Sequence, residues 1–361
     1  MKAVVFTDQG EVIEDRPIPK VLSGEVLVEV AFCGICGSDL HAAHPQFRSG
    51  TIMGHEFSGT IVEVASDVDV CKPGDRIVVN PNGRTCGECS ACTRGFPNLC
   101  AKVWDTSIGL IRNGGLAQYT AVPANVVHVL PEEVDLASAA LIEPLSVALR
   151  TVRNSGFGIG HEAIVFGGGP IGLLVTALLR AAGASKITVV EPSAARRKLA
   201  LKQGATAVID PFSTPVLSVF PDPFSAPSFA FECSGVAELV GEAVAVVRPR
   251  GTVTLTGLSR RPATFDTADV LHKEITLKGS FIYVEEFSEA IQLLASGRID
   301  VDSLITGVVS VEDAPEAFAQ MRSSQDVIKY LISPSAPAGT AGQGLAGSSV
   351  TDAPALSGDP R

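Results

Sequence analysis

The sequence is short of basic residues, and the few that it has do not gather into a patch. Lys and Arg number 28 against 39 Asp and Glu, which leaves a net charge of −11. Nucleic-acid binding needs a clustered basic footprint. The nearest approaches to one, residues 248–251 and the pair Arg260 and Arg261, are too short. Nucleic acid is therefore excluded as the expected partner.

The sequence also lacks a stretch suited to secretion or to a membrane. Its first residues, MKAVVFTDQG, read as a strand and a turn without the apolar core of a signal peptide, so we expect a cytoplasmic protein. The one long apolar run, residues 163–179, contains four glycines and a proline. It is also shorter than the roughly 20 residues that a bilayer needs. We therefore expect no contact with a membrane.

The composition is that of a globular enzyme with room for two domains: 361 residues, 46% apolar and 19% charged. Up to about residue 130, short runs of alternating apolar residues are broken by Gly and Pro, which predicts a β-rich, barrel-like domain. Further on, apolar strands alternate with helices, which predicts a parallel sheet. The expected fold class is α/β, with a β-rich domain and a doubly wound Rossmann sheet.

One short stretch concentrates groups that bind metals. It contains a thiol, a hydroxyl, two imidazoles and a carboxylate, at Cys36, Ser38, His41, His55 and Glu56. Zinc prefers thiolate and imidazole, and a catalytic zinc ion takes three protein ligands and keeps one open position. Cys36 and His55 supply two ligands. A buried thiol with a core histidine, or a redox pair of Cys33 and Cys36, are the alternatives, and the neighbouring polar residues favour the metal.

The third ligand is expected to be a carboxylate, and two candidates stay open. Glu56 lies next to His55, and Glu143 lies in the run IEPLSVAL. We favour Glu143, with Glu56 close to the metal or exchanging with it.

Four of the eight cysteines follow the spacing C-x2-C-x2-C-x7-C, at Cys86, Cys89, Cys92 and Cys100. Four thiolates on a short polar loop match a closed tetrahedral zinc site, which stabilises a loop that buries no core of its own. Two disulfides are the alternative, but cysteines spaced this closely do not easily satisfy disulfide geometry. A structural zinc ion is therefore predicted in addition to the catalytic one.

A glycine turn follows the first strand of the expected parallel sheet. The pattern G-x-G-x-x-G comprises Gly167, Gly169, Pro170, Ile171 and Gly172. Such glycines let the backbone approach a pyrophosphate at the N-terminus of the next helix. The next strand ends in Glu191, which is placed to accept hydrogen bonds from the adenosine ribose. Strand, turn, helix and acid in register predict a dinucleotide site.

Glu191 also predicts which dinucleotide binds. A carboxylate at this position repels a 2′-phosphate, so we expect NAD rather than NADP. Arg196 and Arg197 follow closely in the sequence. They either weaken this preference or belong to the solvated face of a helix.

The remainder of the chain is expected to continue the parallel sheet and then to return to the first domain. Strands are expected at residues 206–210, 228–235, 251–258 and 275–283, with helices at 236–247 and 285–296. The Pro- and Phe-rich stretch 211–227 reads as a loop or a broken helix. Residues 297–333 are too few to stand alone and are expected to pack on the first domain. Beyond residue 333 the chain is mostly Ala, Gly, Ser and Pro, which predicts a flexible tail.

Together these motifs resemble those of the zinc-dependent medium-chain dehydrogenase/reductase superfamily. The residues that carry the resemblance are GICGSDLH, GHEFSGTIVEV, the four-cysteine lobe, IEPLSVAL, GGGPIGLL and VEPSAARR. They are most similar to the polyol branch, which includes 2,3-butanediol, sorbitol and threonine dehydrogenases. The acidic residue in IEPL, where classical alcohol dehydrogenases have cysteine, favours that branch.

The resemblance implies a particular division of the chain. A GroES-like catalytic domain would span residues 1–147, with the structural zinc lobe at about 81–101. A Rossmann NAD-binding domain would span 148–285, and a return segment, 286–333, would precede a tail at 334–361. A homodimer or homotetramer is also implied.

The resemblance further implies residue roles. Cys36, His55 and Glu143 would hold the catalytic zinc, with Glu56 close to it. Ser38 and His41 would form a proton relay. Lys329 matches a position that the family fills with a basic residue, and it would lie near the cofactor phosphates.

The activity implied is the reversible, NAD-linked oxidation of a secondary alcohol, a vicinal diol or polyol of the 2,3-butanediol type, to the ketone. A threonine- or cyclitol-type dehydrogenase is the alternative enzyme, and a catalytically silent protein that binds zinc and NAD is the alternative outside enzymes.

Overall fold

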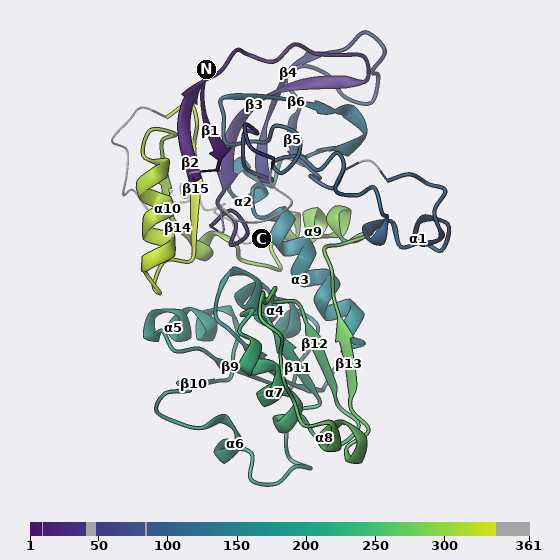
Figure 1. Cartoon of the computed structure of the whole chain (residues 1–361), viewed down its shortest axis with the longest axis vertical. Coiled ribbons are helices and arrows are strands. Elements are labelled where there is room, and N and C mark those ends of the chain that lie inside the picture. The colour runs from purple at the N-terminus through teal and green to yellow at the C-terminus, as the bar shows by residue number, and fades with distance from the viewer. Residues whose placement is uncertain (9, 41–47, 84, 337–361) are drawn as a thin grey trace, which may run out of the picture.

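A computed structural model describes residues 1–8, 10–40, 48–83 and 85–336. The chain forms two lobes, a β-rich one that contains the N-terminus and a second one built on a parallel sheet (Figure 1). His41, the second member of the expected relay, and the tail from residue 337 onwards lie outside the described residues.

The first lobe is a curved sheet with a hairpin beside it. Its elements are β1 (Lys2–Thr7), β2 (Gly10–Asp15), β3 (Glu25–Gly34), β4 (Glu56–Val64), β5 (Arg76–Val79), α1 (Ser90–Thr93), β6 (Tyr119–Pro123), β7 (Val127–Val129), α2 (Leu136–Ala139), β14 (Ile305–Val309), α10 (Ala314–Ser323) and β15 (Lys329–Ile332). The strand order is β14-β15-β3-β4-β5-β7, and β6 also pairs with β3. The β-rich domain predicted from the sequence is therefore present.

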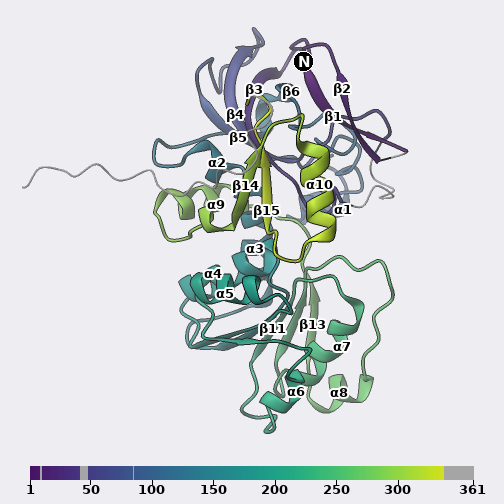
Figure 2. The same ribbon diagram turned by 90° about the vertical axis from the view of Figure 1, so that its left-hand side faces the viewer.

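The last strands of the chain belong to this first sheet. Strand β15 pairs antiparallel with the end of β3, with Leu331 opposite Gly34, and β14 pairs parallel with β15. Figure 2 shows β14, β15 and α10 in yellow beside the purple strands of the N-terminal half. The chain thus leaves the first lobe, builds the second and returns to finish the first.

The second lobe is a parallel sheet with helices on both faces. Its elements are α3 (Ile142–Ser155), β8 (Glu162–Phe166), α4 (Pro170–Ala181), β9 (Lys186–Val190), α5 (Ala194–Gln203), β10 (Ala207–Ile209), α6 (Val216–Val219), β11 (Phe229–Glu232), α7 (Ala237–Val246), β12 (Thr252–Leu255), α8 (Thr267–His272) and β13 (Thr276–Gly279). The next helix, α9 (Glu286–Ala295), packs on α3 and lies with the first lobe (Figures 1 and 2). The strand order is β10-β9-β8-β11-β12-β13. The first three strands are added toward one edge of the sheet and the last three toward the other, as in a doubly wound dinucleotide fold. The α/β fold class predicted from the sequence is confirmed.

One detail of this lobe differs from the pattern read in the sequence, and another agrees with it. The strand expected over residues 275–283 ends at Gly279, and Ile282 has a positive φ of 41°. The chain therefore turns away from the sheet, which directs Tyr283 toward the first lobe. The stretch after β10, expected as a loop or broken helix, contains only the single turn α6.

Helix α3 lies where the two lobes meet (Figure 1). It is buried along most of its length, and it ends at Gly156, whose φ of +79° terminates the helix in the left-handed region. The largest core cluster combines residues of α3, of the parallel sheet and of the first sheet, such as Val78 and Leu331. This cluster therefore spans both lobes, and a side chain on α3 has a rigid support. No helix among the described residues is both long and apolar enough to cross a bilayer.

Candidate active site and metal centres

The pairing of β3 with β4 brings the expected metal ligands together. Gly34 at the end of β3 lies opposite Glu56 at the start of β4. Cys36 follows the first strand and His55 precedes the second, and the ligand atoms of Cys36, His55 and Glu56 all lie within 4.8 Å of one another. A thiol, an imidazole and a carboxylate at this spacing fit a zinc ion.

Gly54 makes the approach of His55 possible. Its φ is +95°, and a Cβ there would lie 2.5 Å from Cys33 Sγ and 2.7 Å from Leu116 Cγ. Only glycine combines this backbone conformation with such close packing. The Gly-His pair in GHEF is thus explained by packing as well as by metal binding.

Asp39 orients the histidine, a role that sequence reasoning did not assign. Its Oδ2 accepts a hydrogen bond from the Cys36 N–H at 2.9 Å. Its Oδ1 lies 3.6 Å from His55 Nδ1, and both atoms are buried without another partner in the described part of the chain. Nε2 of His55 is thereby left for the metal, as in a carboxylate–histidine–zinc arrangement. The only sign of this role in the sequence was the position of the aspartate, three residues after Cys36.

Lys329 holds Glu56, a contact that the resemblance did not imply. Its Nζ donates to Oε2 and Oε1 of Glu56 at 2.7 and 3.0 Å, and to the Ile35 carbonyl at 2.8 Å. Both side chains are buried. Burial is the largest single influence and opposes the ammonium charge, but Glu56, Cys36 and Asp39 together outweigh it and raise the pKa of Lys329. Its three donors are engaged by these oxygens, and its expected place near the cofactor phosphates stays a prediction.

Glu143 lies beside the tight group, in the first turn of α3. Burial raises the pKa of Glu143 to about 7, while the charge of His55 opposes that shift and the charge of Glu56 adds to it. Glu143 is therefore within electrostatic reach of both residues. The structure brings both candidate carboxylates to the site, and the choice of Glu143 as the third ligand stays a prediction.

Tyr283 also reaches the site, and sequence reasoning missed it. It follows β13 in the segment that turns toward the first lobe. Its hydroxyl donates to Asn80 Oδ1 at 3.3 Å and lies close enough to Glu143 to offset part of the rise that burial causes in the pKa of that carboxyl. Its ring packs on Phe287 with centroids 5.4 Å apart. Tyr283 thus links the second lobe to a candidate zinc ligand.

The proton relay is described only in part. Ser38 is half-buried and lies two residues after Cys36, in the turn that follows β3. His41, its expected partner, is outside the described residues. The relay therefore stays a prediction.

The cysteine lobe forms a second metal centre. The sulfur atoms of Cys86, Cys89, Cys92 and Cys100 all lie within 4.8 Å of one another. The Cys86–Cys92 and Cys86–Cys100 sulfurs are 3.9 and 3.5 Å apart, much longer than the roughly 2.0 Å of a disulfide. All eight cysteines carry free thiols. Four thiols in this arrangement fit a structural zinc ion.

Backbone N–H groups support the charged form of these thiols. The Cys89 N–H donates to Cys86 Sγ at 3.3 Å, and the Lys102 N–H donates to Cys100 Sγ at 3.4 Å. Hydrogen bonds from the backbone at Cys92 lower the pKa of Cys89 to about 6. The thiolate, the form that zinc binds, is therefore favoured at Cys89 and Cys100, whereas burial raises the pKa of Cys92.

The glycine turn has the geometry that a pyrophosphate requires. Gly167 has a φ of +100°, and a Cβ at Gly172 would lie 1.9 Å from the Gly167 carbonyl oxygen. A Cβ at Gly169 would meet nothing within 4 Å, so the space above the turn is open. Helix α4 begins with Pro170 and Ile171, and its N-terminal N–H groups favour an anion there.

Glu191 is held at the end of β9 by two backbone groups. Its Oε2 accepts from the Gly168 N–H at 2.6 Å, and its Oε1 accepts from the Ser193 N–H at 2.9 Å. A carboxylate has about four acceptor positions, so capacity for ribose hydroxyls remains. The carboxylate is thus fixed beside the glycine turn, as the sequence pattern predicted.

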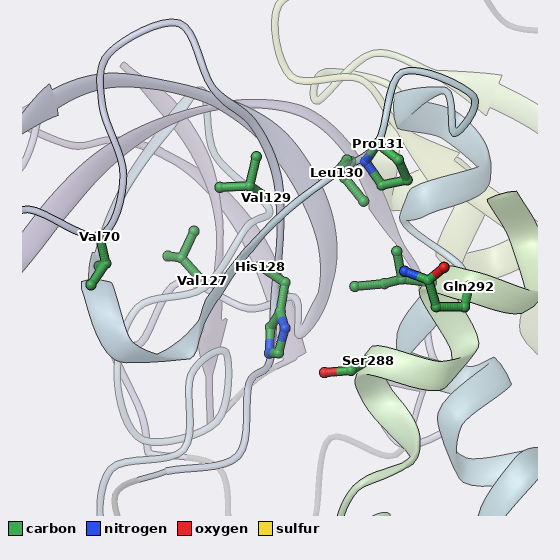
Figure 3. Close-up of a pocket in the computed structure, with 9 residues that line it drawn as sticks. Val70, Val127, His128, Val129, Leu130, Pro131, Ser288 and Gln292 are labelled. Carbon is green, nitrogen blue, oxygen red and sulfur yellow. The ribbon is translucent and has the colours of Figure 1, made fainter.

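A surface cavity of about 580 Å³ lies apart from this site, between β7 and α9 (Figure 3). Its lining residues are Val70, Val127, His128, Val129, Leu130, Pro131, Ser288, Ile291 and Gln292. The His128 ring packs 4.8 Å from Phe287, which in turn packs on Tyr283. The Phe287 and Tyr283 rings therefore separate the cavity from the site, and none of the candidate metal ligands lines it.

Comparison with known proteins agrees with this geometry. The chain matches the alcohol dehydrogenase GroES-like domain over residues 22–132 and the zinc-binding dehydrogenase family over residues 170–296. It is 37% identical over 333 residues to D-xylulose reductase A of Aspergillus oryzae, covering 88% of this chain and 92% of that protein.

Two solved structures show the same fold with sequence similarity. A zinc-binding dehydrogenase from Sinorhizobium meliloti 1021 bound to NADP has a TM-score of 0.87 and 34% identity, covering 92% of this chain and 99% of its own. The 2R,3R-butanediol dehydrogenase from Bacillus subtilis has a TM-score of 0.85 and 34% identity, with the same coverage of 92% and 99%.

The lobe cysteines are predicted to act on stability. Cys89→Ser should lower the zinc content from two ions per chain to one. It should also reduce the free energy of unfolding by more than about 2 kcal/mol, a fall in Tm of roughly 4 to 8 °C, because zinc binding is part of folding here. Metal analysis and thermal unfolding measure both. Cys71→Ser, at a half-buried thiol outside both clusters, is the control, and equal Tm values for the two variants would contradict the assignment.

Tyr283 is predicted to position Glu143. Tyr283→Phe keeps the packing on Phe287 but removes the hydroxyl, so a chelator should extract the catalytic zinc about 10 to 100 times more easily. The cysteine-lobe zinc should stay bound. Tyr119→Phe, which removes a hydroxyl that lies 3.5 Å from Glu29 Oε1 on the first sheet, is the matched control. Identical zinc retention in both variants would rule out the positioning role.

Proposed function

Because the chain belongs to the polyol branch of the zinc-dependent medium-chain dehydrogenases, we propose that it interconverts a secondary alcohol of an open-chain polyol or vicinal diol and the ketone. The observation that carries the proposal is the grouping of Cys36, His55 and Glu56 within 4.8 Å, beside Glu143 at the junction with the dinucleotide fold. An alcohol held there lies where a nicotinamide can reach its carbon.

The chain's own residues divide the chemistry among them. A bound zinc ion would supply a Lewis acid for the alcohol oxygen, and a bound nicotinamide would supply the hydride acceptor. Cys36, His55 and one carboxylate would hold the metal, and Asp39 would keep the His55 imidazole in the orientation that binds it. Ser38 is proposed to accept the hydroxyl proton and to pass it toward His41 and solvent.

The named relatives support an open-chain polyol as the substrate. D-xylulose reductase A is named for a ketose, and it shares 37% identity with this chain. A pentitol and its ketose are therefore the first pair to test. The 2,3-butanediol type stays the second candidate, because the 2R,3R-butanediol dehydrogenase structure matches with a TM-score of 0.85.

NAD is proposed as the preferred cofactor of this NAD(P)-dependent enzyme. Glu191 occupies the ribose position, and both arginines that follow it are engaged elsewhere. Arg197 donates to the carbonyls of Glu191 and Pro192 at 2.8 and 2.7 Å and pairs with Asp210 at 3.3 Å. Arg196 donates to the Val327 carbonyl at 2.6 Å. A 2′-phosphate would therefore meet the Glu191 carboxylate, and Arg196, the one of these two arginines with a guanidinium nitrogen that has no partner among the described residues, is tied to Val327.

A homo-oligomer is also proposed, formed through the outer edge of β13. This strand pairs with β12 alone among the described strands. Its Leu277 and the nearby Leu271 are 37% and 73% exposed. An open edge with apolar neighbours is suited to pairing with a second copy. Light scattering of the purified protein measures the subunit number, and a monomer would refute this proposal.

Activity measurements test the substrate class. Zinc-loaded protein with NAD should oxidise pentitols, hexitols or 2,3-butanediol with a kcat/KM at least about tenfold above that for threonine, a cyclitol or a primary alcohol, because specificity is a difference in transition-state binding. Formation of NADH is the readout. No turnover on any member of the panel by metal-loaded protein would overturn the enzymatic proposal.

The ligand assignment predicts a separation of activity from cofactor binding. Cys36→Ser and His55→Ala should abolish turnover, because the alcohol oxygen loses its electrophile. Both should leave the Kd for NAD within about twofold, since the glycine turn and Glu191 are untouched. Cys71→Ser should behave as the wild type. Cofactor binding lost in parallel with activity would contradict this division.

A further inference from the structure

A contact between the two lobes lies directly beside the ribose-binding carboxylate. Ser193 and Arg196 stand at the start of α5, and Asp326 and Val327 stand in the loop before β15. Ser193 Oγ donates to Asp326 Oδ1 at 2.8 Å, across 133 residues of sequence. Arg196 Nη2 donates to the Val327 carbonyl at 2.6 Å. The metal-binding lobe thus reaches the adenosine end of the cofactor site.

Ser193 joins Asp326 to Glu191 through short hydrogen bonds. Its N–H donates to Glu191 Oε1 at 2.9 Å, and its hydroxyl accepts from the Arg196 N–H at 3.2 Å as the N-cap of α5. Ser193 and Glu191 are buried, whereas Asp326 is exposed. A second carboxylate therefore stands one side chain away from the carboxylate that receives the ribose hydroxyls.

The position of Asp326 matters because the 2′-phosphate of NADP would lie beside Glu191, close to this second carboxylate. In dinucleotide folds the acid after the second strand binds the 2′-hydroxyl, and enzymes that use NADP supply an arginine nearby. The 2′-phosphate adds roughly 1.5 to 2 negative charges. Arg196 is the candidate cation of this chain. Its guanidinium interacts with the charges of both Glu191 and Asp326, and it is bonded to Val327.

We propose that Asp326 is a second determinant of cofactor choice, supplied by the metal-binding lobe. Its carboxylate adds negative charge beside the ribose position and, together with Glu191, offsets the charge of Arg196. Asp326 acts through Ser193 and Arg196, so it is a positioning and electrostatic residue and not a cofactor ligand. This inference rests on the proposed preference for NAD and extends it beyond the dinucleotide-binding motif.

The test removes the charge and keeps the hydrogen bond. Asp326→Asn retains an oxygen that accepts from Ser193. With zinc-loaded, full-length protein, calorimetry should show NADP binding about tenfold more tightly than to the wild type, which corresponds to about 1.4 kcal/mol. The Kd for NAD should stay within about twofold. Since the effect is electrostatic at a solvent-exposed carboxylate, it should shrink at about 1 M salt, where the Debye length is roughly 3 Å.

Two further variants control for structure. Asp326→Glu restores the charge and should restore the wild-type ratio of Kd values. Asp67→Asn removes the same charge from a similar contact in the first lobe, where Asp67 accepts from Ser23 Oγ and the Gly24 N–H. It should leave both Kd values unchanged.

The possible outcomes distinguish the role of Asp326 from the proposed preference for NAD on which it rests. A wild type that binds NADP as tightly as NAD contradicts the proposed cofactor preference itself. An NAD-preferring wild type whose ratio does not change in Asp326→Asn contradicts only the role of Asp326. An equal change for both cofactors shows a structural contact and overturns the inference as well.

Discussion

The buried ion pair between Lys329 and Glu56 is the interaction on which the metal site depends. A charge taken out of water is costly unless a partner compensates it, and removing one member of a buried pair costs about 3 to 5 kcal/mol. Here the lysine comes from the last strand and the carboxylate from the first residue of β4. The pair forms only when β15 has paired with β3. The carboxylate beside the metal is therefore held in place only after the chain has built the second lobe and returned.

The site is consequently a product of both lobes. The first lobe brings Cys36 and His55 together by pairing β3 with β4. Glu143 arrives on α3, which is packed into the shared core, and Tyr283 arrives from the segment after β13. The carboxylates and the metal ligands thus meet at the junction where the nicotinamide of a dinucleotide would enter. The Ser193–Asp326 contact joins the same two lobes at the other end of the cofactor.

The sequence predicted those features whose causes are local. Cysteine spacing determines which thiols can surround one ion, and the four lobe thiols do gather. The glycine turn was predictable because Gly172 must lie against Gly167 whatever the rest of the chain does. The strand over residues 275–283 was predicted too long, because an apolar β pattern continues past Gly279 although Ile282 turns the backbone. Asp39 was visible in its motif, but its orientation toward His55 was not.

By itself, the sequence determined the fold class, the donor chemistry of two zinc sites and the dinucleotide turn, because spacing and residue type are properties of neighbours along the chain. The tertiary structure decided which distant charges face each other. A lysine in a short apolar strand is compatible with many partners, and only the pairing of β15 with β3 directs Lys329 to Glu56. The same holds for Tyr283 with Glu143 and for Asp326 with Ser193. Strand register and lobe packing set these contacts, and both depend on residues far apart in the sequence.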